Sequence, residues 1–193
     1  EAHAACARAF GARGGEPARL GRHLLAAARP LEAIDPLLEG AEALSRTTSH
    51  LDALAVLADA DDALGHAAVD DPRRGAAAAL RCNLLRVLGY PEEATIAADR
   101  GLALAQRYRW PSVLPLKLAR AQIGLVHADP ETGPRLRVLL AEALASRDPA
   151  LIGKAFFALS GEAQFRGDPE AASLAEKALS HLSRAGDLLL VAH

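Results

Sequence analysis

Histidine is the residue type in this chain best suited to metal binding or to proton transfer near neutral pH. The chain contains seven histidines, at His3, His23, His50, His66, His127, His181 and His193. No two of them are four residues apart and there is no HExxH motif, the spacing with which one helix presents two imidazoles to zinc. We therefore expect the histidines at helix ends and faces, and we predict no metal site.

Acidic and hydroxyl side chains give equally little support for catalysis. Asp59, Asp61 and Asp62 could imitate the two carboxylates of a glycosidase, but their spacing suits the exposed face of a helix. Ser160 precedes Gly161 without the strand that a nucleophile elbow requires. The phosphate-binding motif GxxxxGK[ST] is absent. These patterns predict a protein that is not an enzyme and that carries no cofactor.

The two cysteines and one aromatic patch are the other features of the sequence that could carry chemistry. Cys6 and Cys82 lie far apart and form no metal-type spacing, so we expect two buried thiols in a reduced, cytoplasmic protein. The patch Arg107–Trp110 mixes cations with aromatics, as single-stranded nucleic-acid sites do. No basic stripe surrounds it, however, and the interpretation we favour is that Tyr108 and Trp110 wedge between helix pairs.

A fixed period in the sequence organises the positions of the helices. Asp148 and Asp187 open similar segments, and two earlier steps of the same length reach Arg109 and Asp70. The turns at Tyr90-Pro91, Asp129-Pro130 and Asp168-Pro169 keep this step. A constant period in this range of lengths is typical of stacked helical repeats. The fold class predicted is therefore all-α: a solenoid of antiparallel helix pairs with a repeat of about 39 residues.

Apolar periodicity and helix-start signals give the expected boundaries. Asp-Pro places an N-cap before a proline in the first turn, where the missing N–H is not needed. After a short helix over 1–13 and one from Glu16-Pro17 to Arg29, the expected helices are 30–46, 50–65, 72–88, 91–107, 111–126, 130–145, 149–165 and 169–184. We expect Pro36 to kink or delay its helix, and Gly133-Pro134 to interrupt another. In helix 50–65, Leu51, Leu54, Leu57 and Leu64 are expected to face inward.

Two domains follow from these boundaries. Residues 1–29 form an N-terminal helical cap or junction, and residues 30–193 form repeats at 30–66, 71–108, 110–146 and 148–185, with a further repeat starting at 186–193. The chain has no initiating Met and stops as another first helix begins, so we expect a fragment of a longer polypeptide. Its apolar end, Leu188 to Val191, could support self-association.

Several segments carry a resemblance to a known family. They are Ser146–Leu151, Leu159–Gly161, Phe165–Ala172, Ala178-Leu179 and Ala185–Asp187, together with Arg22–Ala27 before Pro30–Ala33. They resemble the tetratricopeptide-like (TPR-like) repeat arms of bacterial transcriptional regulators of the maltose-regulator type and of the large ATP-binding LuxR type. The resemblance implies a right-handed superhelix that binds an effector or partner beside separate nucleotide-binding and DNA-binding modules. Similar arms occur on bacterial serine/threonine kinases and nucleotide cyclases, where they recruit proteins.

A polar ladder on the concave face is the binding site we predict. Arg81 aligns with Arg120, and Asn83 aligns with Gln122, when the chain is shifted by one repeat period. The full set of candidate residues is Arg81, Asn83, Arg86, Lys117, Arg120, Gln122, Lys154 and Gln164. Curved solenoids commonly bind partners on their inner surface, so a protein, a peptide or a small effector is the expected ligand.

Composition limits the other partners. The net charge is −2 and charged residues make up 24% of the chain, without the clustered basic stripe of a nucleic-acid-binding domain. No apolar run approaches the roughly 18 residues of a membrane span. We therefore expect no direct contact with nucleic acid and none with membranes.

Overall fold

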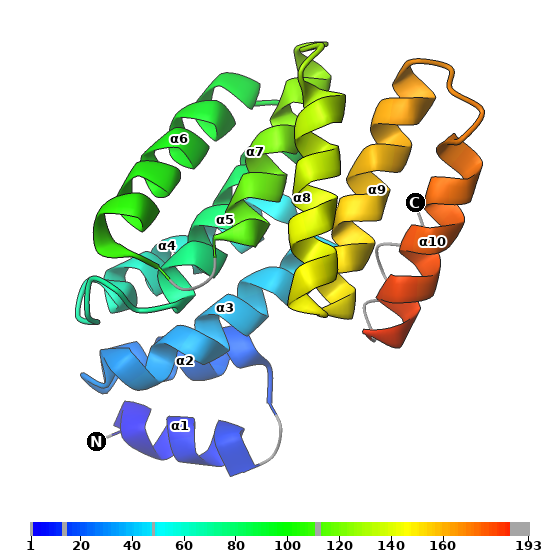
Figure 1. The fold of residues 1–193 in the computed structure, drawn as a ribbon. Helices are drawn as coiled ribbons and strands as arrows, with labels where there is room; N and C mark the ends of the chain where they lie inside the picture. Colours follow the sequence, from blue (N-terminus) through cyan, green and yellow to red (C-terminus); the bar gives the residue numbers. More distant parts are fainter. Residues whose placement is uncertain (1, 13–14, 48, 111–112, 186–193) are drawn as a thin grey trace.

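α-Helices form all of the regular secondary structure in the residues that the computed structural model describes, which are 2–12, 15–47, 49–110 and 113–185 (Figure 1). The helices are α1 (Ala2–Ala12), α2 (Pro17–Ala26), α3 (Pro30–Arg46), α4 (His50–Leu64), α5 (Arg73–Val87), α6 (Pro91–Tyr108), α7 (Leu114–Val126), α8 (Thr132–Ser146), α9 (Pro149–Phe165) and α10 (Ala171–Arg184). The all-α prediction is confirmed. The expected start of a further repeat at 186–193 lies outside the described residues.

Capping explains where these helices begin. The Asp148 carboxylate accepts hydrogen bonds from the backbone N–H groups of Ala150 at 2.8 Å and Leu151 at 3.4 Å, and α9 starts at the next residue, Pro149. After Asp129 and Asp168, the chain first makes a turn closed by i→i+3 backbone bonds. For this reason α8 and α10 begin two residues later than the Asp-Pro signals predict.

Two prolines were expected to disturb helices. α3 begins at Pro30 as predicted and continues through Pro36, so Pro36 does not delay the helix, and the alternative of a kink at Pro36 stays a prediction. Gly133 and Pro134 do not interrupt α8, because the helix starts at Thr132 and both residues fall in its first turn. A proline is tolerated there because the first N–H groups of a helix have no partner within the helix.

One turn conformation recurs after five of the described helices. Ala28, Gly89, Arg109, Ala128 and Gly167 have left-handed backbone angles, with φ of 57°, 83°, 52°, 51° and 70°. In each turn the next residue donates a backbone hydrogen bond to the carbonyl five residues before it, at 2.8 to 3.0 Å. This pattern is the Schellman motif that ends helices. Three of these positions, Gly89, Ala128 and Gly167, are each 39 residues apart.

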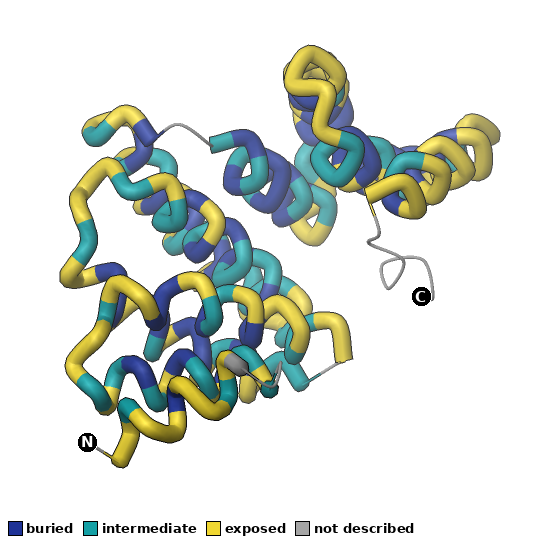
Figure 2. Tube along the Cα trace, turned by 90° about the horizontal axis from the view of Figure 1, so that it is seen from below, coloured by how far each residue is buried: buried dark blue, intermediate teal, exposed yellow. Residues whose placement is uncertain are grey.

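The packing follows the order of the chain. Each helix packs against the next one in sequence, and α3, α5, α7 and α9 also contact one another in that order. Figure 1 shows the outcome: α6 and α8 lie on either side of α7, and α9 and α10 form a hairpin at the C-terminal end. Figure 2 shows that the buried residues face the contacts between helices, while the exposed residues follow the outer surfaces.

Three hydrophobic clusters form the core. The first joins α1 to α5, the second lies between α5, α6 and α7, and the third joins α7 to α10. In α4, Leu57 and Leu64 are buried as predicted, but Leu51 is 69% exposed, which contradicts the expectation that it faces inward. Trp110 is buried after α6, and its indole N–H donates to the carbonyl of Val69 at 2.8 Å. Trp110 thus packs against the connection between α4 and α5, whereas Tyr108, the other residue of the expected wedge, is only half-buried.

Candidate functional site

An open groove of about 600 Å³ lies over α7, between α6 and α8. Its lining comes from one residue of α6, four of α7 and four of α8, namely Leu102, Lys117, Arg120, Ala121, Gly124, Arg135, Val138, Leu139 and Glu142.

One face of α7 forms the floor of the groove. Lys117, Arg120, Ala121 and Gly124 follow the spacing i, i+3, i+4, i+7, so they share one face of the helix. Ala121 and Gly124 are the small residues on this face. Gly124 must stay small, because a Cβ atom there would collide with the hydroxyl of Thr132 at the start of α8. The floor is therefore apolar at one end and cationic at the other.

Ion pairs tie the floor to the walls. Lys117 Nζ lies 2.9 Å from both carboxylate oxygens of Glu142 on α8, and Arg120 Nε lies 2.7 Å from Asp99 Oδ1 on α6. Because these groups are about one third to one half exposed, each pair stabilises the fold by only about 0–1 kcal/mol. Their main effect is to fix the direction of each cation.

The groove is lined by three cations, Lys117, Arg120 and Arg135, and by one carboxylate, Glu142. Each cation forms an ion pair, with Glu142, Asp99 and Asp129 respectively, and Asp99 and Asp129 lie outside the lining. The lining itself therefore carries more positive than negative charge, which favours the approach of acidic groups. The exposed valine of the α8 wall, Val138, adds an apolar contact surface.

The structure divides the predicted ladder between different helix faces. Only Lys117 and Arg120 line the groove. Arg81 forms an ion pair with Asp61 of α4, whereas Gln122 is half-buried and lies outside the groove lining. Residues two apart on a helix point about 200° apart. Arg81 and Asn83 therefore point to different sides of α5, and Arg120 and Gln122 point to different sides of α7. Alignment by the repeat period does not take the direction of side chains into account.

The remaining candidates lie elsewhere. On α5, Asn83 Oδ1 and Arg86 Nε are buried and have no hydrogen-bond partner among the described residues, and burial lowers the pKa of the Arg86 guanidinium. On α9, the side chains of Lys154 and Gln164 are exposed. The eight predicted residues thus do not form a continuous ladder in the described part of the chain.

Sequence reasoning missed the walls of the groove. Leu102, Arg135, Val138, Leu139 and Glu142 belong to α6 and α8, which were expected to lie away from the ligand. The one local signal in the sequence was Val138. It is apolar, but its neighbour Leu139 already belongs to the buried face of α8, so Val138 is left on the surface.

The other chemically active side chains do not form a second cluster of ligands. α1 and α2 bring the Nδ1 atoms of His3 and His23 to 3.1 Å, a contact between residues 20 apart that the sequence did not indicate. No group of three or more His, Cys, Asp or Glu side chains among the described residues is placed to hold a metal ion. Cys82 is buried as predicted, but Cys6 is exposed on the short helix α1, so the expectation of two buried thiols was wrong.

Two further findings complete the description. Within the described residues, none of the helices combines the length and the apolar character needed to cross a membrane. No family model, curated protein or solved structure matches this chain.

Proposed function

We propose that this chain is a non-enzymatic binding arm that holds a segment of a partner protein in the groove over α7. The groove itself is the observation that carries the proposal. It combines an apolar floor with cations whose directions are fixed by Glu142 and Asp99. A concave surface with apolar area and a few directed polar groups is the usual form of a binding site.

The arm consists, in this proposal, of TPR-like helix pairs over residues 30–185 stacked in a right-handed superhelix, with residues 1–29 as a cap. Three observations support it. The Schellman turns recur at 89, 128 and 167, and the helices α3, α5, α7 and α9 contact one another in series. The ion pair between Arg81 and Asp61 also has a counterpart in the next repeat, between Arg120 and Asp99.

The occupant we propose is a short acidic peptide segment with apolar side chains on one face. The excess of cations in the lining favours acidic groups, and Leu102, Ala121 and Val138 offer contacts for apolar ones. Gly124 lies seven residues after Lys117 on α7, which is about 10 Å at 1.5 Å per residue. This length fits two turns of a partner helix or three to four extended residues.

The parent protein, by the resemblance of the repeats, is a cytoplasmic bacterial regulator of transcription. Binding in the groove would regulate it only if the resting and active states of the parent bind the segment with different affinities. This part of the proposal rests on the sequence motifs, whereas the groove supports only the binding role.

A peptide-display selection against the chain tests the binding role. We expect the enriched peptides to share acidic and apolar residues at helical spacing. Val138→Glu, on the groove wall, should weaken the selected peptide at least tenfold in fluorescence anisotropy, because it places a negative charge beside the acidic ligand. Ile96→Glu is the matched control: Val138 and Ile96 are both 68% exposed, but Ile96 does not line the groove.

The ionic strength of the buffer gives a second readout. Affinity should fall as salt rises, because exposed charges are screened beyond about 10 Å at 0.1 M ionic strength. Equal weakening by both variants, or peptides with no shared sequence, would contradict the proposed site. Circular dichroism of each variant checks that the helices are intact.

A further inference from the structure

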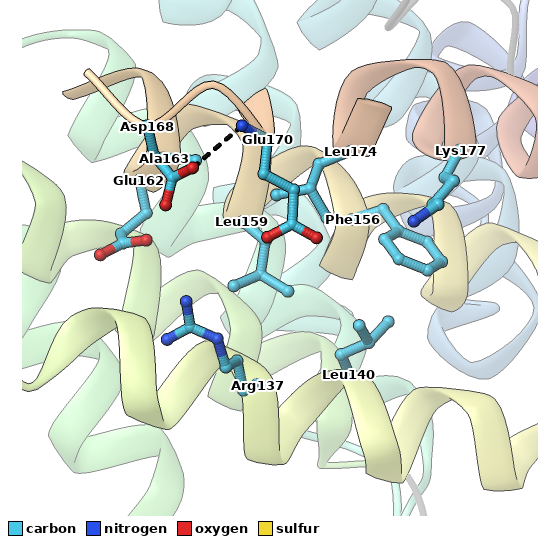
Figure 3. Close-up of a pocket in the computed structure, with 10 residues that line it drawn as sticks. All are labelled: Arg137, Leu140, Phe156, Leu159, Glu162, Ala163, Asp168, Glu170, Leu174 and Lys177. Atoms are coloured by element: carbon cyan, nitrogen blue, oxygen red, sulfur yellow. Dashed lines mark hydrogen bonds between the residues drawn. The ribbon is translucent and has the colours of Figure 1, made fainter. Parts of the chain in front are cut away.

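A second cavity of about 250 Å³ lies on the other side of α8, where α9 and α10 face it (Figure 3). It shares no lining residue with the groove over α7. Its volume is below the roughly 300–1,000 Å³ of sites for drug-sized ligands, so a ligand of this cavity must be small. Its walls carry both carboxylates and cations, together with apolar side chains.

Glu162 marks the acidic end of this cavity. The residue is only 7% exposed, and its Oε1 forms an ion pair with Arg166 Nε at 2.7 Å. The other oxygen, Oε2, is buried and has no hydrogen-bond partner among the described residues. An unsatisfied buried acceptor costs about 1–3 kcal/mol, and more when it is charged. A bound donor would remove that cost.

The position of Glu162 is set by close packing. The helix α8 approaches it at Gly133, where an added Cβ atom would lie 2.5 Å from Oε1. The carboxylate therefore lies beside the first turn of α8, where the free N–H groups favour negative charge.

The cationic groups face these carboxylates. Figure 3 shows the guanidinium of Arg137 extending from α8 toward Glu162 and Glu170. No hydrogen bond or ion pair joins the Arg137 side chain to another described residue, and the same holds for the carboxylate of Glu170. The backbone N–H of Glu170 donates to Asp168 instead, at 2.9 Å. Arg137 and Glu170 thus keep their charges available on opposite sides of the cavity.

Apolar contacts complete the walls. Phe156, Leu159 and Leu174 lie between the charged groups, and the Lys177 ammonium stands 6.0 Å from the centre of the Phe156 ring. This cation–π contact holds Lys177 at the end of the cavity away from Glu162 (Figure 3). The cavity therefore offers the carboxylates of Glu162 and Glu170 to an ammonium group, and the cations of Arg137 and Lys177 to a carboxylate. The apolar side chains offer a surface for the rest of a ligand.

We propose that this cavity is a binding site for a free amino acid. The ammonium group of the ligand donates to the carboxylates of Glu162 and Glu170. Its carboxylate pairs with Arg137, and its side chain lies against Phe156. The proposal is independent of the groove over α7 and would stand if no peptide bound there.

Calorimetric titration of the whole chain with each of the common free L-amino acids tests the site. We expect at least one to bind with a measurable heat and to raise the melting temperature, because a ligand of the folded state stabilises it. Two analogues of that amino acid, one without the ammonium group and one without the carboxylate, should each bind at least tenfold more weakly. A derivative blocked at both groups should not bind, which separates a free amino acid from a residue within a peptide.

Two variants locate the site. Arg137→Gln should weaken binding at least tenfold, whereas Glu176→Gln, on an exposed residue of α10 outside the lining, should not change it. The proposal is overturned if no amino acid binds, if Arg137→Gln leaves the affinity unchanged, or if either analogue binds as well as the amino acid. The last two results would show that the amino acid binds at an unrelated site or without the proposed contacts.

Discussion

Trp110 shows how one side chain joins parts of the chain that are distant in sequence. It follows α6, and its hydrogen bond to Val69 reaches the connection between α4 and α5, 41 residues earlier. The left-handed residue Arg109, with φ of 52°, turns the chain so that the indole points inward. The aromatic patch of the sequence is thereby explained by packing between helix pairs.

Replacement of Trp110 by phenylalanine tests this contact. Trp110→Phe should lower the free energy of unfolding by about 1–3 kcal/mol, because it removes the N–H donor and part of the buried ring. Tyr90→Phe serves as the control, since Tyr90 is exposed and should change stability by less than about 0.5 kcal/mol. Urea unfolding followed by circular dichroism measures both. Equal effects would mean that the Trp110 contact contributes nothing specific.

The two cysteines give a second prediction at the residue scale. Cys6 is exposed, whereas burial raises the pKa of the Cys82 thiol to about 11. At pH 8 a chromogenic thiol reagent should therefore modify one cysteine in the folded chain and two after unfolding, since the thiolate is the reactive form. In Cys6→Ser the folded chain should show almost no reaction. Rapid reaction of that variant would contradict the burial of Cys82.

The raised pKa of the Cys82 thiol also makes the stability of the fold depend on pH. The unfolded thiol ionises near 9.0 and the folded thiol near 11, so between these values the folded state binds more protons than the unfolded state. The Cys82 contribution to stability is then fully present below pH 9 and decreases as pH rises toward 11. Between Cys6→Ser and Cys6→Ser/Cys82→Ala, the first should lose more stability over this range. Parallel curves would contradict the shift.

At the scale of the helix, α9 contains two glycines in opposite environments. A Cβ atom on Gly153 would lie 2.6 Å from Leu182 Cγ and 3.1 Å from its backbone nitrogen, so α10 packs directly on that glycine. At Gly161 the nearest atom outside the helix is Leu125 Cδ1 at 3.9 Å, which is an ordinary contact. Helix propensity favours alanine equally at both positions, and only the neighbouring helix distinguishes them.

This difference predicts opposite signs for one substitution. Gly161→Ala should stabilise the chain by about 0.5–1 kcal/mol through helix propensity. Gly153→Ala should destabilise it by about 1–2 kcal/mol, because the collision with α10 exceeds that gain. Thermal unfolding of the two variants measures the sign. Stabilisation by both would show that α10 can move away without cost.

At the scale of the whole molecule, each helix is stabilised mainly by its contacts with neighbouring helices. The three core clusters follow one another along the chain, and each helix packs mainly against helices close to it in sequence. Stability in such an arrangement is approximately a sum of local and nearest-neighbour terms. Damage at one end should therefore loosen that end before the centre.

Leu182→Ala tests this expectation. Leu182 is buried in α10 at the C-terminal end, and its truncation should cost about 2–5 kcal/mol locally. The helical signal in circular dichroism should then begin to fall at lower urea than the fluorescence of Trp110, the single tryptophan, which reports on the centre. Coincident transitions would indicate that the described helices unfold as one cooperative unit.

Sequence alone determined the local features of this protein. Asp148-Pro149 fixed the start of α9, and the signals at Asp129 and Asp168 placed two more starts within two residues, because caps and turns act through hydrogen bonds between near neighbours. Only the tertiary structure decided which surfaces face one another. Leu51 fits the apolar pattern of α4 but stays exposed, and Arg81 and Asn83 align by period but point to different sides of α5. Burial, the groove walls and the unpartnered oxygen of Glu162 depend on the path of segments far away in the chain, and periodicity within a single helix contains no information about that path.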